Sequence, residues 1–315
     1  MIPLEESIQS IVASCPTAGE GVNRWFYLAA LRLLRLGLDK LKVEELLEEG
    51  SVECGRAIRP DEIPRAVRNA AAALTGARPL SHCKWPARNY EQIEAVASAG
   101  LSTNDLEESS PLRPDAGSTE AIVDALFPRN PLICAGRTLT GAVTKHRADW
   151  RGSLARQQFI VPSPMSKPTG ITLEGKTSAR SLDNTGPRRF LVVEFDFAEH
   201  DDSGHDTDAA PVLRRLAEQG RTISDLCASL HAHLADFRPL ALVVHSGRRS
   251  AHGWYPVRDE DEDVMLRFMR FAVSLGADPA TWTRAQFVRM PDGLRNNGNR
   301  QRVLYYNPAV IGGAE

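Results

Sequence analysis

Two acidic residues, separated by a single residue, interrupt the most apolar segment of the chain. Residues 189–197 read RFLVVEFDF, a pattern that predicts a β-strand carrying Glu194 and Asp196. Alternate side chains of a strand share a face, so we expect the two carboxylates to project together, with Cα atoms about 7 Å apart. Two neighbouring carboxylates repel each other and resist burial, and Mg²⁺ or Mn²⁺ relieves both costs. A strand end with both acids in water is the alternative. The opposite face of the strand is expected to enter a core through Val193, Phe195 and Phe197.

A second candidate site is the turn between the predicted strands 240–246 and 253–257. Its sequence, SGRRSAHGW, combines hydroxyl groups, two arginines and a histidine with small residues. Hydroxyl and guanidinium groups donate hydrogen bonds to phosphate oxygens, and turns of small residues expose backbone amides. We interpret the turn as phosphate-binding, and a polar hairpin with His252 partly exposed is the alternative. The candidate ligands of phosphate are Ser246, Arg248, Ser250 and His252.

Two further polar residues lie in the C-terminal part of the chain. Asp278 follows a predicted helix over 263–276, where alone it would be an ordinary helix-exit residue before Pro279. Arg289 lies on a predicted strand that is otherwise apolar, and a buried arginine needs a carboxylate or phosphate partner.

Charge is distributed unevenly along the sequence. The net charge is −2, yet residues 137–190 carry ten bases and three acids, whereas both flanking parts are acidic. A basic stretch beside an acidic cluster suits a protein that holds phosphates on one side and cations on the other, although chance patchiness explains the charge pattern equally well.

The acid-x-acid strand, the Ser-x-His segment and the later acid together resemble the archaeo-eukaryotic primase superfamily, which includes primase-polymerases of plasmids and phages. The resemblance covers about residues 120–310. The runs RMPDGLR and QRVLYYNP near the end of the chain also look like members from mobile elements. The chain departs from the family in carrying Glu194 where aspartate is commoner, and in lacking a recognisable helicase domain or zinc-binding insertion. The matching positions are Glu194, Asp196, Ser250, His252 and Asp278.

This resemblance implies an α+β primase-polymerase domain, with a mixed or antiparallel sheet like that of the RNA-recognition motif, that performs template-directed nucleotidyl transfer. Two Mg²⁺ or Mn²⁺ ions, about 3.5–4 Å apart in such sites, would be held by Glu194, Asp196 and Asp278. The triphosphate of an NTP or dNTP would contact the Ser246–His252 turn and Arg289.

The resemblance also implies a DNA template and primer as partners, and a separate helicase where strand opening is needed. The basic stretch is expected to follow the DNA backbone, and a solvated basic face is the alternative. Its candidate residues are Lys176, Arg180, Arg188 and Arg189.

Three other functions compete with this hypothesis. A metal-dependent nuclease would use the same carboxylates, and a replication initiator or nucleic-acid-binding module would use the fold without catalysis. A P-loop NTPase is suggested by GITLEGKT at 170–177, but we interpret this match as a decoy because no buried strand precedes it and no helix follows. The acidic segment 199–208 does not fit an EF-hand pattern and is interpreted as a solvated loop.

The composition, with 42% hydrophobic and 25% charged residues, predicts a globular protein and excludes collagen-like, coiled-coil and wholly disordered chains. No apolar run approaches 18 residues, which predicts no membrane partner. Five cysteines without a CxxC pair fit a reducing cytosol, so a cytoplasmic location is expected. The pattern of helices and strands predicts a helical domain over 1–78, a linker with short helices over 79–118 and the catalytic domain over 119–315.

Overall fold

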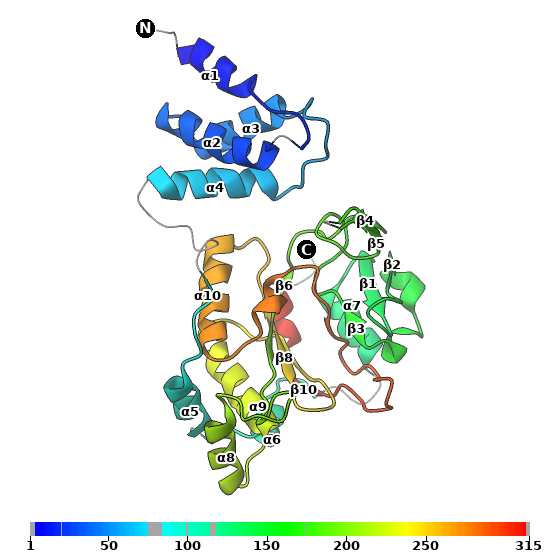
Figure 1. Ribbon diagram of the computed structural model, residues 1–315. Helices are drawn as coiled ribbons and strands as arrows, with labels where there is room; N and C mark the ends of the chain where they lie inside the picture. Colours follow the sequence, from blue (N-terminus) through cyan, green and yellow to red (C-terminus); the bar gives the residue numbers. More distant parts are fainter. Residues whose placement is uncertain are drawn as a thin grey trace. The chain divides into compact units, whose positions relative to one another are not determined.

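The computed structural model describes residues 4–19, 21–74, 84–98, 100–113, 118–172 and 174–312. The chain divides into two compact units, Met1–Lys84 and Trp85–Glu315 (Figure 1). The second unit contains every candidate site residue that the sequence predicts.

The first unit is a bundle of helices with one core. Its amphipathic sequences place apolar side chains on one face of each helix, and the Asp39 carboxylate starts the third helix by accepting a hydrogen bond from the Lys42 amide at 2.9 Å. The described helices are α1 (Leu4–Val12), α2 (Val22–Arg35), α3 (Lys40–Gly50) and α4 (Glu62–Leu74). Their buried core includes Phe26, Leu33, Val43, Leu47 and Val67.

The described part of the expected linker is folded onto the second unit. Helices α5 (Tyr90–Ser98) and α6 (Thr103–Glu108) pack on α9 (Ile223–Ala235). The Asp225 carboxylate of α9 accepts a hydrogen bond from the Thr103 amide at 2.8 Å. The linker predicted over 79–118 is therefore corrected, because apolar residues between its prolines are buried in the main core. Residues 75–83 and 114–117 lie outside the described residues. The buried residues of the two short helices are Ile93, Ala97 and Leu106.

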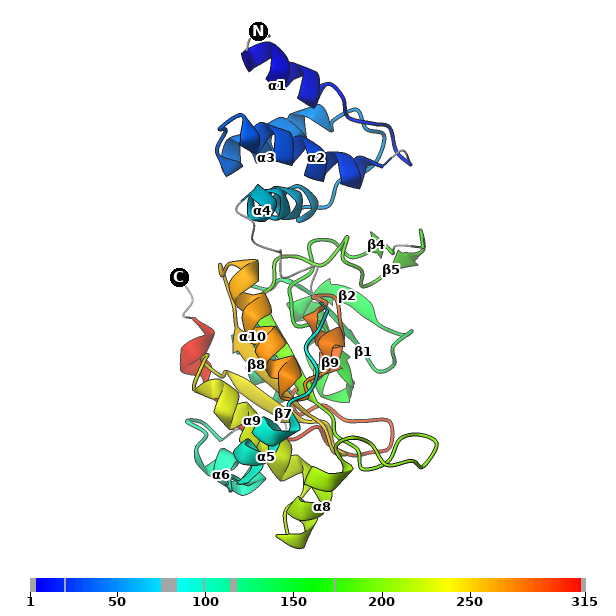
Figure 2. The ribbon, with the colours of Figure 1, turned by 60° about the vertical axis from the view of Figure 1, so that its left-hand side comes forward.

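The main sheet of the second unit is antiparallel and has four strands, in the order β10-β7-β8-β6. Along the chain its elements alternate as β-α-β-β-α-β, and β8 lies between β6 and β7. α9 and α5 lie together beside this sheet (Figure 2). The last strand, β10, adds to the edge of β7. The strands are β6 (Phe190–Phe195), β7 (Leu242–His245), β8 (Ala251–Pro256) and β10 (Val303–Tyr306). The helices between them are α8 (Ala210–Glu218), α9 and α10 (Glu262–Ser274).

A second antiparallel sheet has the order β2-β1-β3-β9, and β4 and β5 form a separate hairpin. The strands are β1 (Leu132–Gly136), β2 (Val143–His146), β3 (Phe159–Ile160), β4 (Gly170–Ile171), β5 (Thr177–Ser178) and β9 (Val288–Arg289). The remaining elements are helix α7 (Thr119–Leu126) and the 3₁₀ turns η2 (Arg147–Trp150), η3 (Leu154–Arg156), η4 (Pro279–Trp282) and η5 (Pro308–Ile311).

The alternation predicted for the acidic strand is confirmed. Val193, Phe195 and Phe197 belong to the core beneath α9 and α10, whereas Phe190 and Val192 belong to a different core shared with the second sheet. Glu194 alternates with the first set, so it lies on the face of β6 that is directed toward the second sheet. The predicted α+β class with antiparallel pairing is confirmed as well.

Two features bear on the competing hypotheses. The segment 170–177 is the β4–β5 hairpin, in which the Thr172 amide donates to the Lys176 carbonyl at 2.8 Å, and no helix follows it directly. This is not the strand–loop–helix arrangement of a P-loop. None of the helices in the described part of the chain has the length and apolarity needed to cross a membrane.

Candidate functional site

Strand pairing places Glu194 directly opposite His252. The two residues are register partners between β6 and β8, and His252 Nε2 lies 3.4 Å from Glu194 Oε1. The side chain of His252 is 2% exposed, and neither of its ring nitrogens has a hydrogen-bond partner among the described residues. Burial, followed by the positive charge of Arg289, lowers the pKa of His252 to about 3. His252 is therefore a neutral imidazole with free hydrogen-bonding capacity beside a carboxyl group, and the partly exposed alternative is wrong.

Asp278 reaches the same place from the end of α10. Its backbone amide donates a hydrogen bond to the Glu194 carbonyl at 2.9 Å, and Ala277 forms a β-bridge with Phe195. The carboxylate of Asp278 also accepts a hydrogen bond from the Ala280 amide at 2.9 Å, which fixes the turn after the helix. The third predicted acid therefore lies next to the first, although the two are far apart in the sequence.

The carboxyl group of Glu194 is strongly perturbed. Burial, then the negative charges of Asp278 and Asp196, raise its pKa to about 7, against the opposing effects of Arg289 and of a hydrogen bond from Ser250. The side chain is 20% exposed, so it is accessible from one direction. A carboxyl group with this pKa, near two other carboxylates, is typical of a functional site.

Asp196 forms an ion pair that the sequence analysis missed. Its Oδ1 accepts a hydrogen bond from Arg249 Nε at 2.7 Å, and both side chains are about two-fifths exposed. Because Phe195 is opposite Ala251, residues just before Ala251 lie close to those just after Phe195. This register was the signal that would have selected Arg249 over its neighbour Arg248, which is exposed.

The predicted phosphate-binding turn is held by hydrogen bonds between its own first and last residues. The Ser246 amide donates to the Ser250 carbonyl at 2.8 Å, and the Ser250 amide donates to Ser246 Oγ at 3.2 Å. Gly247 has a φ of +78°, and a Cβ there would lie 3.0 Å from the Arg300 carbonyl oxygen, so glycine is required. Ser246 is therefore buried as part of the turn, whereas Ser250 reaches Glu194.

Three residues outside the predicted set hold this turn in place. Arg295 Nη1 donates to the Ser246 carbonyl at 3.2 Å, and Asn299 Nδ2 donates to the Gly247 carbonyl at 3.0 Å. His245 Nδ1 accepts a hydrogen bond from the Gly247 amide at 3.2 Å. The contacts of Arg295 and Asn299 come from a distant loop, and no local sequence pattern indicates them.

Arg289 approaches the acids from the second sheet. It is half-buried on β9, with its guanidinium 5.0 Å from the centre of the Phe159 ring. Burial and the charge of Arg295 lower its pKa, while Glu194 and Asp196 act in the opposite direction. The site thus has carboxylates on the main sheet and an arginine on the other sheet, as its strand position suggested.

The four predicted DNA-binding residues lie in different environments. Lys176 is exposed at the β4–β5 turn. Arg180 packs 4.2 Å from the centre of the Phe287 ring and donates to the Ala285 carbonyl, and Arg188 packs similarly on Trp282 and donates to its carbonyl. Burial lowers the pKa of Arg188 to about 10. The guanidinium groups of Arg180 and Arg188 are therefore engaged within the fold and are less available to a phosphate. Arg189 is half-buried against Phe190.

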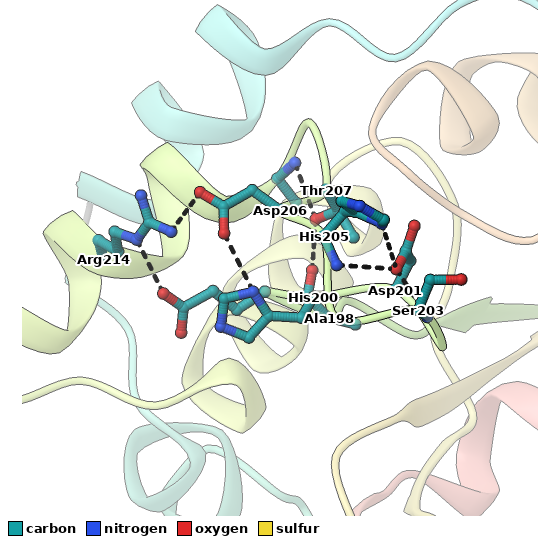
Figure 3. Close-up of polar contacts among 10 residues, drawn as sticks. Ala198, His200, Asp201, Ser203, His205, Asp206, Thr207 and Arg214 are labelled. Carbon is teal, nitrogen blue, oxygen red and sulfur yellow. Dashed lines mark hydrogen bonds and ion pairs between the residues drawn. The ribbon is translucent and has the colours of Figure 1, made fainter.

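The acidic segment after β6 forms a loop held by its own polar contacts (Figure 3). His200 Nδ1 lies 3.0 Å from Asp206 Oδ1, and Asp201 Oδ1 accepts hydrogen bonds from the amides of Ser203 and His205. Arg214 of α8 pairs with Asp206 and with Glu199. The loop is solvated, as predicted. Asp201 and Asp206 form their hydrogen bonds and ion pairs with residues of the loop and of α8, not with residues around Asp196.

The donor chemistry of the main site fits Mg²⁺ or Mn²⁺. Within the described residues, no group of three or more His, Cys, Asp or Glu side chains is already arranged to hold a metal ion. A hard cation would nevertheless relieve the repulsion that raises the pKa of Glu194.

Comparison with known proteins gives no match, since no family model, curated protein or solved structure is significantly similar to this chain.

Proposed function

We propose that the second unit is a nucleotidyltransferase of the primase-polymerase type, which extends or starts a nucleic acid strand on a DNA template. The observation that carries this proposal is the approach of Glu194, His252 and Asp278 from three separate elements. Glu194 faces His252 across two strands, and Asp278 is joined to Glu194 by a backbone hydrogen bond. The acidic strand, the later histidine and the last acid, in this order along the chain, are the features by which the sequence resembles primases.

The three carboxylates would hold Mg²⁺ or Mn²⁺, and the ions would supply Lewis acidity to a 3′-hydroxyl and an α-phosphate. Asp278 is oriented by the Ala280 amide, and Asp196 is oriented by Arg249. At neutral pH, Glu194 is poised between its protonated and ionised forms because its pKa is about 7. The carboxylate is therefore expected to be fully available only when a cation or a higher pH favours ionisation.

The imidazole and the nearby cations would bind the triphosphate of an NTP or dNTP. His252 is neutral and buried and has two unused ring nitrogens, so a phosphate oxygen would satisfy its one N–H donor. Ser250 and Arg289 lie beside the same carboxyl group, and Arg248 is exposed at the turn that precedes Ser250. A DNA template and primer, and a separate helicase, are proposed as macromolecular partners, with Lys176 as the exposed candidate for a DNA contact.

The direct test is incorporation of labelled NTPs or dNTPs on primed and unprimed DNA templates, with Mg²⁺ or Mn²⁺. We expect metal-dependent products longer than the primer, or new strands where no primer is supplied. Lys176→Ala tests the P-loop alternative and should leave nucleotide binding unchanged, because the 170–177 segment is a hairpin rather than a P-loop. Shortening of the DNA without nucleotides would support a nuclease instead, and binding without either reaction would support a non-catalytic module.

His252→Ala is expected to weaken nucleotide binding by about 1.5–3 kcal/mol, or roughly 10- to 150-fold, because a donor to a charged group is lost. The fold should survive, since the ring makes no hydrogen bond that the described residues would miss. Calorimetric titration of a dNTP with Mn²⁺, together with a thermal melt, measures both quantities. An unchanged affinity in a folded variant would remove His252 from the nucleotide site.

A further inference from the structure

The first unit contains a cavity that plays no part in the proposed reaction. It has a volume of about 1040 Å³ and lies along α1 and α3, with the loops that follow these two helices at one end. Here it is called the α1–α3 groove. Its lining consists of Glu5, Ile8, Gln9, Val12, Ala13, Cys15, Thr17, Leu46, Glu49, Gly50, Glu53 and Cys54. This volume is at the upper end of the range for small-ligand sites, which is large enough for several side chains of a partner.

The groove combines apolar and acidic side chains. Ile8 and Leu46 are half-buried against the core of the bundle and present their remaining surface to the groove. The charged members of the lining are the three exposed glutamates Glu5, Glu49 and Glu53, and no lysine or arginine belongs to it among the described residues. The lining is therefore an apolar strip with negative charge at both helices.

These glutamates differ from other acids of the same unit. Glu62 is paired with Arg56 at 2.6 Å, and Glu45 is paired with Lys42 at 2.9 Å. No ion pair within the described part of the first unit involves the glutamates of the groove. Basic residues of the described part of this unit lie on α2 and α4, at the start of α3 and in the loop before α4, and none of them lines the groove. The residues that line the groove therefore contribute negative charge and no positive charge.

We propose that the α1–α3 groove binds a basic amphipathic helix of a partner protein. Apolar residues at i, i+3, i+4 and i+7 of that helix would lie on the strip formed by Ile8, Val12 and Leu46, as in helix-in-groove recognition. Lysine or arginine on its flanks would pair with Glu5 on one side and with Glu49 and Glu53 on the other. α1, which lines the groove along most of its length, has nine residues, or about 13 Å of helix, so the groove accommodates roughly two turns of a partner. The proposal is independent of the nucleotidyltransferase reaction.

The test uses the full chain and a fluorescein-labelled peptide of about 14 residues, with leucine at helical spacing and lysine elsewhere. Fluorescence anisotropy near 0.15 M ionic strength should give an affinity in the micromolar range. Glu49→Lys with Glu53→Lys should weaken binding by at least about tenfold. The matched control, Glu6→Lys with Glu48→Lys, makes the same change of net charge at exposed residues outside the groove and should have a much smaller effect.

A second variant separates shape from charge. Ala13→Trp fills the groove at an exposed position without changing charge, and it should also weaken binding by about tenfold. Circular dichroism establishes that each variant retains its helices. Equal weakening by both charge-reversed pairs, or full binding by Ala13→Trp, would mean diffuse electrostatic attraction and would overturn the proposal. Absence of binding by the unmodified protein at millimolar peptide would overturn it too.

Discussion

Replacing Glu194 with glutamine is expected to abolish nucleotide incorporation and to make the protein more stable above neutral pH. Activity should fall by about 10³-fold or more, because an amide holds Mg²⁺ or Mn²⁺ too weakly to replace a carboxylate. The gain in stability follows from linkage, since the pKa of Glu194 is raised from 4.5 to about 7 in the folded protein. A carboxyl group with a raised pKa stabilises the fold fully below pH 4.5, and this stability is lost as the pH rises through 7. The loss amounts to about 3 kcal/mol as an upper bound.

The measurement is urea unfolding at pH 5 and pH 8 without metal, alongside primer extension with Mn²⁺. The free energy of unfolding of Glu194→Gln, minus that of wild type, should be larger at pH 8 than at pH 5. Asp196→Asn is the matched control, because Asp196 pairs with Arg249 near the surface and its loss should change stability by less than about 1 kcal/mol. A Glu194→Gln protein that unfolds much earlier at pH 8 yet still extends primers would show a structural ion pair instead of a catalytic site.

Acidification should destabilise the protein through His231, by about 3 kcal/mol between pH 6.5 and pH 4. His231 of α9 is completely buried, with Nδ1 3.1 Å from the Tyr255 hydroxyl and Nε2 3.3 Å from the Ala251 carbonyl. Burial lowers the pKa of this imidazole from 6.5 to about 3. A base with a lowered pKa stabilises the fold above its unfolded pKa, and the stability is lost as the pH falls below 6.5.

His231→Gln tests this expectation, because glutamine retains a donor and an acceptor but does not titrate. The variant should be less stable than wild type at pH 7, where the packing of the ring is lost, and the difference should shrink toward pH 4. His205→Gln, at a side chain that is 81% exposed, should follow the wild-type curve. Parallel curves for His231→Gln and wild type would contradict the assigned role. Chemical unfolding at four or five pH values gives the free energies needed.

The strand that carries Glu194 was predictable because a period of two is visible within nine residues. The position of Asp278 was not visible in that way, because a backbone hydrogen bond between distant segments brings it to Glu194. Its selection came from the family resemblance. Arg249 was missed for a related reason, since choosing it over Arg248 requires the exact register of β6 with β8.

Composition misled the prediction for the segment before residue 119. Prolines and polar residues between 79 and 118 are typical of a linker, yet α5 and α6 bury three apolar residues against the main core. Short helices with few buried residues give weak periodic signals, although a buried isoleucine or leucine side chain contributes about 1.5–3 kcal/mol. The roles of Arg180 and Arg188 were also hidden from local sequence patterns. Their basic character suggested DNA contacts, but the aromatic rings and carbonyl groups that they contact lie far away in the sequence.

The bridge between Phe195 and Ala277 also sets an order of events during protein synthesis. β6 is translated before its partners: one of its edges pairs along its length with β8, and only the C-terminal end of the other edge pairs, with residues 277–278 after α10. At about 5–20 residues per second, the second edge waits on the order of ten seconds for its partner. During that interval the nascent chain presents a strongly apolar strand with unpaired backbone groups, the condition under which strands from neighbouring chains associate. The backbone contact that brings Asp278 to Glu194 is therefore also the one that covers this end of the strand last.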